Sequence, residues 1–284
     1  MTTTEADKAV SHGATPWAIE NLPPFPALAT RLLQLLSQED VNVNEVARTV
    51  SAEPVFAARV LQLANSPLFA VRAEVKSIPQ AIIMLGLARV RAITVTRALG
   101  DFIAPAINFR TLRMCWRNTL AGAIVAEELA KASGIDADLA YLAGLLRDIG
   151  RLALLIKYPR EYDTLLAVTA EEHFDLLATE RELFDVDHCE AGASVVERFA
   201  LPPEFADVIA RHHEPLKEGR LCLAALVGCA DRLADAIGFA LITDIARPSF
   251  ADLSSEFNAI SGRRFENDPE VLRTAIEEKI AAWA

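Results

Sequence analysis

Hydrophobic residues recur along this chain mostly at the three- and four-residue spacing of amphipathic helices, and stretches that alternate like β-strands are nearly absent. After Glu53-Pro54, Phe56, Val60 and Leu63 share one face of a predicted helix, with proline at its first position. The same spacing predicts helices over 109–132, 138–157, 188–200, 203–213 and 221–237. The predicted fold class is therefore all-α.

Sequence signals for helix ends refine this pattern. Asn42 followed by Glu45 resembles a capping box for a short helix before Glu53. Pro79 opens a long apolar stretch that runs through Leu87. Asp268-Pro269 begins a last helix with Leu272, Ile276, Ile280 and Trp283 on one stripe, and the weakly periodic stretch 238–267 is expected to lead into it.

The breaks in the pattern suggest two helical blocks joined near 101–109, where Pro105 and Asn108 interrupt the spacing. We expect a flexible N-terminus over 1–16, a block of short helices over 17–108, a second block over 109–237, and a C-terminal extension over 238–284 that ends in a helix. The second block collects nearly all the potentially reactive side chains.

Composition adds a charge asymmetry to this picture. The 284 residues are 52% hydrophobic and 24% charged, which is typical of a globular protein, and the net charge of −11 argues against a protein that coats nucleic acid. Residues 59–117, however, hold nine basic and two acidic side chains. This segment could face solvent, steer an acidic partner, or dock against the acidic residues 118–284. Its candidate anion- or partner-binding residues are Arg89, Arg91, Arg97, Arg110, Arg113 and Arg117.

Cysteine usage and the N-terminus indicate a cytoplasmic protein. The four cysteines are too few and too scattered for a disulfide framework, and because they form no CxxC pair, neither a zinc ribbon nor a thioredoxin-like redox site is indicated. The first residues lack the profile of a signal peptide, and the most continuous apolar run, 221–230, is about half the length that spans a bilayer. We therefore expect no membrane span.

Candidate chemistry gathers in the second block. His188, His212 and His213 are three of only five histidines, and Asp148 and Asp231 lie in apolar helical runs. A carboxylate in such a run must be paired, hydrogen-bonded or bound to a metal. Imidazoles and carboxylates from several helices are what a Zn, Mn or Fe site uses, whereas a His-His pair at a helix C-terminus can simply interact with the last carbonyls.

At these residues the chain resembles the HDOD domain over about 22–237. The similarity rests on the order and spacing of several segments, which are Leu22-Pro-Pro-Phe-Pro26, Arg59-Val-Leu-Gln-Leu-Ala-Asn-Ser66, Ser77-Ile-Pro-Gln-Ala-Ile-Ile-Met-Leu-Gly86, Tyr141-Leu-Ala-Gly-Leu-Leu-Arg-Asp-Ile-Gly-Arg151, Phe184-Asp-Val-Asp-His188 and His212-His213. HDOD domains are helical relatives of the HD and HD-GYP metal-dependent phosphohydrolases, usually described as regulatory modules of bacterial signalling. The resemblance implies an HD-like helical core behind the N-terminal block.

The resemblance also places the HD ligand set on this sequence. The retained positions are Asp148, His188, His212 or His213, and Asp231, while the first ligand histidine falls at Asn118 and the histidine of the His-Asp doublet at Arg147. Asn118 offers only a weak carbonyl oxygen, and Arg147 offers a permanent positive charge and no lone pair. We hypothesise that the Arg147 guanidinium occupies the vacated metal position and pairs with Asp148 or Asp231. A solvent-facing Arg147 and a retained divalent metal (Mn, Fe, Zn or Mg) are the alternatives.

Three classes of function follow. The first is a non-catalytic HDOD-type regulatory module that needs no cofactor and acts in trans on protein partners of a signalling pathway. The second is a divergent metal-dependent phosphohydrolase for a nucleotide or cyclic dinucleotide, although Glu214–Gly219 stands where a GYP-type segment is expected. Direct DNA binding through residues 43–64 is disfavoured because the surrounding chain is acidic. A nucleotide or cyclic dinucleotide could also bind without being hydrolysed.

Overall fold

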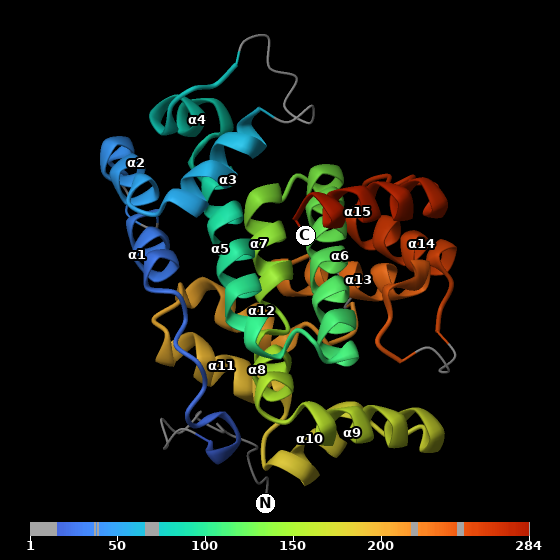
Figure 1. Ribbon diagram of the computed structural model, residues 1–284. Helices are drawn as coiled ribbons and strands as arrows, with labels where there is room; N and C mark the ends of the chain where they lie inside the picture. The colour runs from blue at the N-terminus through green and yellow to red at the C-terminus, as the bar shows by residue number, and fades with distance from the viewer. Residues whose placement is uncertain are drawn as a thin grey trace, which may run out of the picture.

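The computed structural model describes residues 16–36, 38, 40–65, 74–216, 221–242 and 247–283, and within these ranges all regular structure is helical (Figure 1). The predicted all-α fold class is confirmed. The expected flexible N-terminus lies, except for its last residue, outside the described residues. The helices are α1 Ala27–Leu36, α2 Val43–Ser51, α3 Pro54–Ala64, α4 Ile78–Leu85, α5 Leu87–Ile103, α6 Arg110–Ser133, α7 Ala137–Leu146, α8 Ile149–Lys157, α9 Pro159–Glu172, α10 Leu176–Phe184, α11 His188–Arg198, α12 Ala206–Arg211, α13 Leu223–Ala234, α14 Phe250–Ser261 and α15 Pro269–Trp283, with short turns η1 Trp17–Ile19, η3 Ala104–Ala106, η4 Pro203–Phe205 and η5 Asp235–Phe239.

Several helices form where the sequence predicted them. The predicted face of α3 is buried, and Asn42 caps α2 by accepting hydrogen bonds from the backbone N–H groups of Asn44 and Glu45. The stretch opened by Pro79 bends by 107° between α4 and α5, where Gly86 adopts a φ of 79°. A positive φ is accessible to glycine because it has no Cβ.

Two expectations need correction. The predicted helix over 138–157 is two helices, α7 and α8, which are separated at Arg147 and Asp148. The stretch 238–267 contains the unpredicted helix α14, whose Ser249 and Asp252 form a capping box and whose Leu253 and Phe257 are buried. The α14 helix is marked by its capping box, whereas the break between α7 and α8 has no side-chain cap and falls at two buried polar residues, so hydrophobic periodicity alone does not report either boundary.

The helices enclose two hydrophobic cores. The smaller core lies among α1 to α4 and the first part of α5, and includes Val46, Phe56, Val60 and Ile82. The larger core extends from η1 and α1 through the second part of α5 to α15. The single helix α5 thus joins the two cores, and the C-terminal helices α14 and α15 bury their apolar faces in the larger one.

Close helix crossings in the larger core position the polar residues described next. Helix α6 packs against α7 and α13, and α8 packs against α11. A Cβ at Gly228 of α13 would overlap the carbonyl of His212, so glycine permits this close approach. Among the described residues no single helix has the length and apolar composition to cross a membrane, although the bent pair Ile78–Leu85 and Leu87–Ala106 passes that test when taken together.

Candidate functional site

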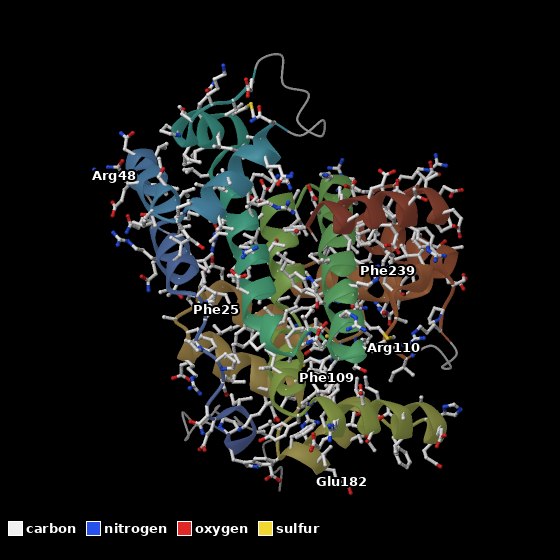
Figure 2. All side chains as sticks on the ribbon, viewed as in Figure 1. Phe25, Arg48, Phe109, Arg110, Glu182 and Phe239 are labelled. Atoms are coloured by element: carbon white, nitrogen blue, oxygen red, sulfur yellow. The ribbon has the colours of Figure 1, made fainter. Side chains whose placement is uncertain are left out.

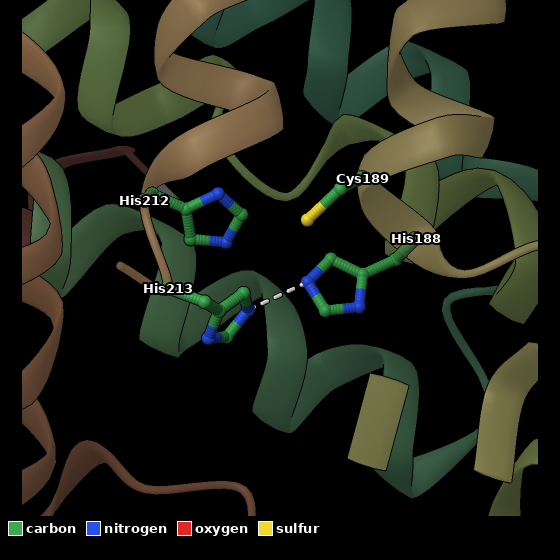
Figure 3. A group of neighbouring side chains, drawn as sticks. All are labelled: His188, Cys189, His212 and His213. Atoms are coloured by element: carbon green, nitrogen blue, oxygen red, sulfur yellow. Dashed lines mark hydrogen bonds between the residues drawn. The ribbon is translucent and has the colours of Figure 1, made fainter. Parts of the chain in front are cut away.

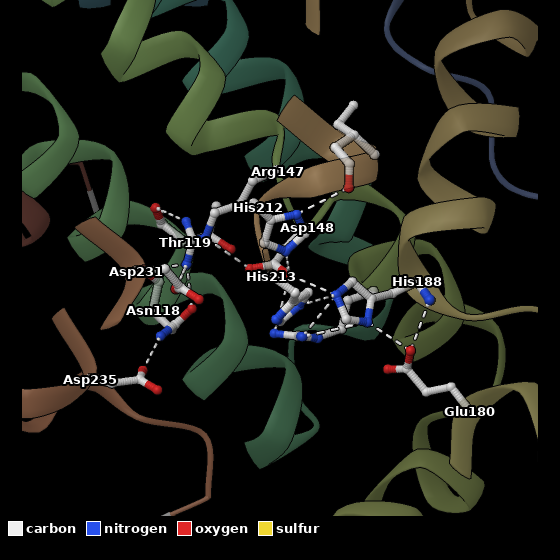
Figure 4. A network of polar contacts seen from close by, with 12 residues as sticks. Asn118, Thr119, Arg147, Asp148, Glu180, His188, His212, His213, Asp231 and Asp235 are labelled. Carbon is white, nitrogen blue, oxygen red and sulfur yellow. Dashed lines mark hydrogen bonds and ion pairs between the residues drawn. The ribbon is translucent and has the colours of Figure 1, made fainter. Parts of the chain in front are cut away.

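A fully buried arginine lies at the centre of the polar network in the larger core (Figure 4). The Arg147 guanidinium donates to Asn118 Oδ1 at 2.6 Å and to Asp231 Oδ1 at 2.5 Å. It also donates to the backbone carbonyls of Gly144, at 2.8 Å, and of Asn118 and Thr119, both at 3.3 Å. Its Nε lies 3.1 Å from Asp148 Oδ2. The structure therefore places Arg147 between the two aspartates with which it was hypothesised to pair.

Helix α6 leaves room for this guanidinium at a glycine. A Cβ on Gly122 would lie 2.6 Å from an Arg147 terminal nitrogen and 2.8 Å from its central carbon. Any larger residue would push the guanidinium away from Asn118 and Asp231. The Arg147 guanidinium thus fills the space that a side chain at position 122 would occupy.

A second arginine, Arg151, lies on the other side of Asp148. Its NH1 is 3.1 Å from Asp148 Oδ1, and its NH2 is 3.1 Å from His188 Nε2. Burial alone would raise the pKa of Asp148, but the charges of Arg151 and Arg147 outweigh burial and hold that pKa well below its usual range. Asp148 is therefore a buried carboxylate held between two guanidinium groups.

His188 is held in one orientation by Glu180. Glu180 Oε2 lies 2.6 Å from His188 Nδ1 and accepts from the His188 backbone N–H at 2.8 Å, and Tyr162 donates to Glu180 Oε1. With Nδ1 donating to Glu180, the lone pair is on Nε2, which accepts from Arg151. Burial and the charge of Arg151 lower the pKa of His188, which makes the imidazole neutral at neutral pH.

His188, Cys189, His212 and His213 form a group whose candidate ligand atoms all lie within 4.8 Å of one another (Figure 3). His213 Nε2 lies 2.8 Å from His188 Nε2. His212 Nδ1 contacts the carbonyl of Ile209 at 3.0 Å. His212 Nε2 is buried, has no hydrogen-bond partner among the residues that the structure describes, and lies 3.6 Å from Asp148 Oδ1. Both His212 and His213 thus face this site.

The remaining family positions lie at the edge of the network. Asn118 Nδ2 donates to Asp235 Oδ1 at 2.9 Å, and Arg247 lies 3.3 Å from the other oxygen of Asp235. Burial and the negative charge of Asp231 raise the pKa of Asp235 to about 7. These residues line a small cavity of about 100 Å³ together with Arg151, His213 and Asp231. The Asp231 side chain is 16% exposed, so solvent reaches this part of the polar network.

The donor set does not fit a metal of the HD type. In the half formed by Asn118, Asp148 and Asp231, the Arg147 guanidinium already contacts all three side chains. In the other half of the ligand set, Arg151 contacts the side chains of both Asp148 and His188. A divalent cation would have to displace these positive groups. Three other groups here are of types that bind metals: His212 Nε2, which has no hydrogen-bond partner among the described residues, Cys189 and His213. Burial, however, raises the pKa of the Cys189 thiol and so disfavours the thiolate that a metal requires.

The six candidate arginines of the basic segment do not form one surface. Arg89 pairs with Glu127 at 3.1 Å and Arg91 with Glu204 at 2.7 Å, so these two dock against the acidic second block. Three others, Arg97, Arg113 and Arg117, line a common cleft together with Arg59, and Arg110 does not line it. Of the three uses suggested for this segment, the contacts of Arg89 and Arg91 support docking against the acidic residues 118–284, while the binding of an anion or a partner stays a prediction.

The sequence reasoning missed several members of the network. Arg151 lies three residues after Asp148, a spacing that places the two on one helical face, so this ion pair had a sequence signal. Glu180, Tyr162, Cys189 and Asp235 had none, because their partners come from other helices.

Comparisons with known proteins agree with this architecture. A family model described as HDOD domain matches residues 22–215. The structure resembles an HDOD domain protein of unknown function from Geobacter sulfurreducens, with a TM-score of 0.68 and 26% identity over 93% of this chain and 91% of the other. It also resembles a protein from Shewanella amazonensis named a putative phosphohydrolase, with the same TM-score and identity over 95% and 97% of the two chains. A curated, uncharacterized protein from Treponema pallidum is 24% identical over 197 residues, and this chain spans only 38% of its length.

Proposed function

This chain belongs to the HDOD domain family, and we propose that it is a non-catalytic regulatory module that acts in signal transduction through contacts with protein partners. The observation that carries the proposal is the buried Arg147 guanidinium, which contacts Asn118, Asp148 and Asp231 where the family pattern has metal ligands. A fixed cation at this position neutralises the aspartates and leaves the core stable without a metal.

Arg151 supports the same conclusion from the other half of the site. It donates to the lone pair of His188, a further ligand position of the family, and contacts the second oxygen of Asp148. A water bound and activated by a metal would be the nucleophile for hydrolysis of a phosphodiester. With both halves occupied by guanidinium groups, the residues needed to hold that metal are already paired.

Metal content and hydrolysis test the proposal together. We expect purified wild-type protein to carry substoichiometric Mn, Fe, Zn and Mg by mass spectrometry and to leave bis(p-nitrophenyl) phosphate intact. The double variant Asn118→His/Arg147→His restores the family's imidazoles and removes one guanidinium, so it should gain metal relative to wild type, with Arg147→His alone as the control. Affinity capture before and after chelator treatment should retrieve the same partner proteins.

The alternative is a metal-dependent phosphohydrolase, and one observation favours it. The buried His212 Nε2 and both oxygens of Asp148 make no hydrogen bond among the described residues, and His213 and Cys189 lie beside them. Such atoms could ligate a cation if Arg151 moved. Stoichiometric metal in wild-type protein, lost in His212→Ala together with phosphodiester hydrolysis, would establish this alternative and overturn the regulatory proposal.

A further inference from the structure

A larger concave site lies where the N-terminal helices meet the larger core. It is a cleft of about 900 Å³ whose lining residues come from α3, α5, α6 and α15 and from the turn around η3. Among its described lining residues, four are arginines, Arg59, Arg97, Arg113 and Arg117, and one is acidic, Asp101. The cleft therefore combines a concave, half-open shape with a surplus of positive charge.

Arg113 presents a charge with no carboxylate partner among the described residues. Its NH1 donates to the carbonyls of Ile107, at 3.1 Å, and Asn108, at 2.7 Å, which fix the exposed guanidinium at the end of the cleft. These bonds orient the group without neutralising it. A guanidinium that is already held in place loses less conformational entropy when it binds an anion.

Two other arginines form exposed ion pairs. Arg97 contacts both oxygens of Asp101, with NH2 at 2.8 Å and Nε at 3.0 Å, and Arg117 lies 2.5 Å from Glu277 of α15. All four side chains are at least 38% exposed, and exposed ion pairs contribute little net stability. An incoming anion can therefore replace these carboxylates at small cost.

The apolar part of the lining provides a surface for a flat ring. Trp116 is half-buried and lies three residues after Arg113, so both project from neighbouring positions of α6. The indole N–H of Trp116 has no hydrogen-bond partner among the described residues, and Leu120, Ile103 and Ile107 line the cleft beside it. Aromatic faces and guanidinium planes both stack on planar rings.

We propose that this cleft binds an organic phosphate that carries a flat ring, of the size of a nucleoside monophosphate, with the phosphate against Arg97 and Arg113 and the ring against Trp116. The volume lies in the range of small-molecule sites, and arginine binds phosphate through two parallel hydrogen bonds. The volume of the cleft and the half-buried Trp116 beside the arginines favour a small ring-bearing ligand over an acidic segment of a partner protein. The cleft shares no lining residue with the histidine site, so this inference goes beyond the regulatory proposal.

Titration calorimetry of the full chain at physiological salt tests the cleft with AMP, GMP, CMP, UMP and pyrophosphate. We expect saturable binding of at least one nucleotide, tighter than that of pyrophosphate. Arg113→Ala should weaken it by about tenfold or more, the worth of a charged hydrogen-bonded contact. Arg110→Ala removes the same charge one turn earlier on α6, outside the cleft, and should leave affinity within about twofold.

Two further variants separate phosphate from ring recognition. Asp101→Asn removes the acid that competes for Arg97 and should tighten binding, whereas Trp116→Leu should weaken nucleotides more than pyrophosphate. If Trp116→Leu does not fold, the comparison of Arg113→Ala with Arg110→Ala still decides. The proposal is overturned if no nucleotide gives saturable heat, or if the two arginine variants lose affinity equally. Arg113-dependent binding of a glutamate-rich peptide without nucleotide binding would instead identify a protein-docking surface. None of these results depends on the metal content of the histidine site.

Discussion

Replacement of Arg147 by methionine is the most direct test of the guanidinium's role. Methionine retains much of the volume of the side-chain stem but removes the charge and all the hydrogen-bond donors. The variant leaves Asp148 fully buried with Arg151 as its remaining cation, and leaves Asp231, whose side chain is 16% exposed, facing the small cavity. The perturbation is therefore the loss of one buried cation from a site that keeps both of its aspartates.

The expected cost follows from that environment. Removal of one partner from a buried ion pair typically lowers the free energy of unfolding by about 3–5 kcal/mol, because the remaining charge is left uncompensated. Here Arg151 still lies 3.1 Å from Asp148, and water can reach Asp231, so we expect the lower end, about 3 kcal/mol. This is a large part of the roughly 5–15 kcal/mol that stabilises a typical domain.

Urea unfolding followed by circular dichroism measures this cost, with Arg110→Met as the matched control for loss of one exposed arginine.

The pH dependence of the free energy of unfolding gives a second readout. In wild type the pKa of Asp148 is lowered by Arg151 and Arg147 against the effect of burial, so its contribution is present above the unfolded value of 3.8 and is lost as pH falls through the folded pKa. In Arg147→Met the folded pKa of Asp148 rises, so the variant protonates this carboxylate at a higher pH than wild type does. The difference in unfolding free energy between variant and wild type should therefore narrow as the pH is lowered through the raised pKa.

Two results would refute this reasoning. One is a cost below about 1 kcal/mol, similar to that of an exposed arginine, which would mean that Arg147 is not the main partner of the aspartates. The other is a large cost that does not change with pH, which would point to lost packing and not to an uncompensated carboxylate.

Three other predictions use the same unfolding assay. Gly122→Ala should lower the free energy of unfolding by about 1–3 kcal/mol, because its Cβ would lie 2.6 Å from the Arg147 guanidinium. Gly100→Ala is the control and should be neutral or stabilising, because no heavy atom lies within 4 Å of its new Cβ. Equal effects of the two substitutions would contradict the close fit at Gly122. Because burial and Arg151 lower the pKa of His188, this group should make wild type less stable as pH falls below about 6.5, by at most about 1.4 kcal/mol per pH unit, and His188→Gln should flatten that slope. Asp235 acts with the opposite sign: its pKa is raised to about 7, so the folded state retains a proton that the unfolded state releases, and Asp235→Asn should lose stability more steeply than wild type between about pH 7 and pH 5.

The helical fold could be predicted because each amphipathic helix repeats its own pattern of buried residues. The predicted stripe of α15 illustrates this, since Leu272, Ile276 and Ile280 are all buried. The break between α7 and α8 could not be predicted in the same way. Arg147 and Asp148 lie within an apolar run and are themselves buried, so the pattern of exposure continues unbroken across the turn.

The candidate site was predictable only in part for a related reason. The family resemblance supplied Asp148, His188, either His212 or His213, and Asp231, and the chemistry of arginine suggested a guanidinium among them. The resemblance could not supply Glu180, which fixes His188 from α10, or Gly122, whose missing side chain makes room for Arg147. Such contacts depend on how α6, α7 and α10 lie in space, and no spacing within one helix encodes them.

The charge balance of the buried network explains why the aspartate of the His-Asp doublet is retained although its histidine is not. Asp148, Asp231 and Glu180 supply three carboxylates, Arg147 and Arg151 supply two guanidinium groups, and His188 is neutral. Among the described residues in contact with Asp148, Arg151 would be the one permanent cation left without Arg147. Removal of Asp148 would in turn leave two buried guanidinium groups with one fewer anion, so we expect Asp148→Asn to be strongly destabilising. Pairing with Arg147 and Arg151 is thus a sufficient physical reason for a buried carboxylate at Asp148, whether or not the site is catalytic.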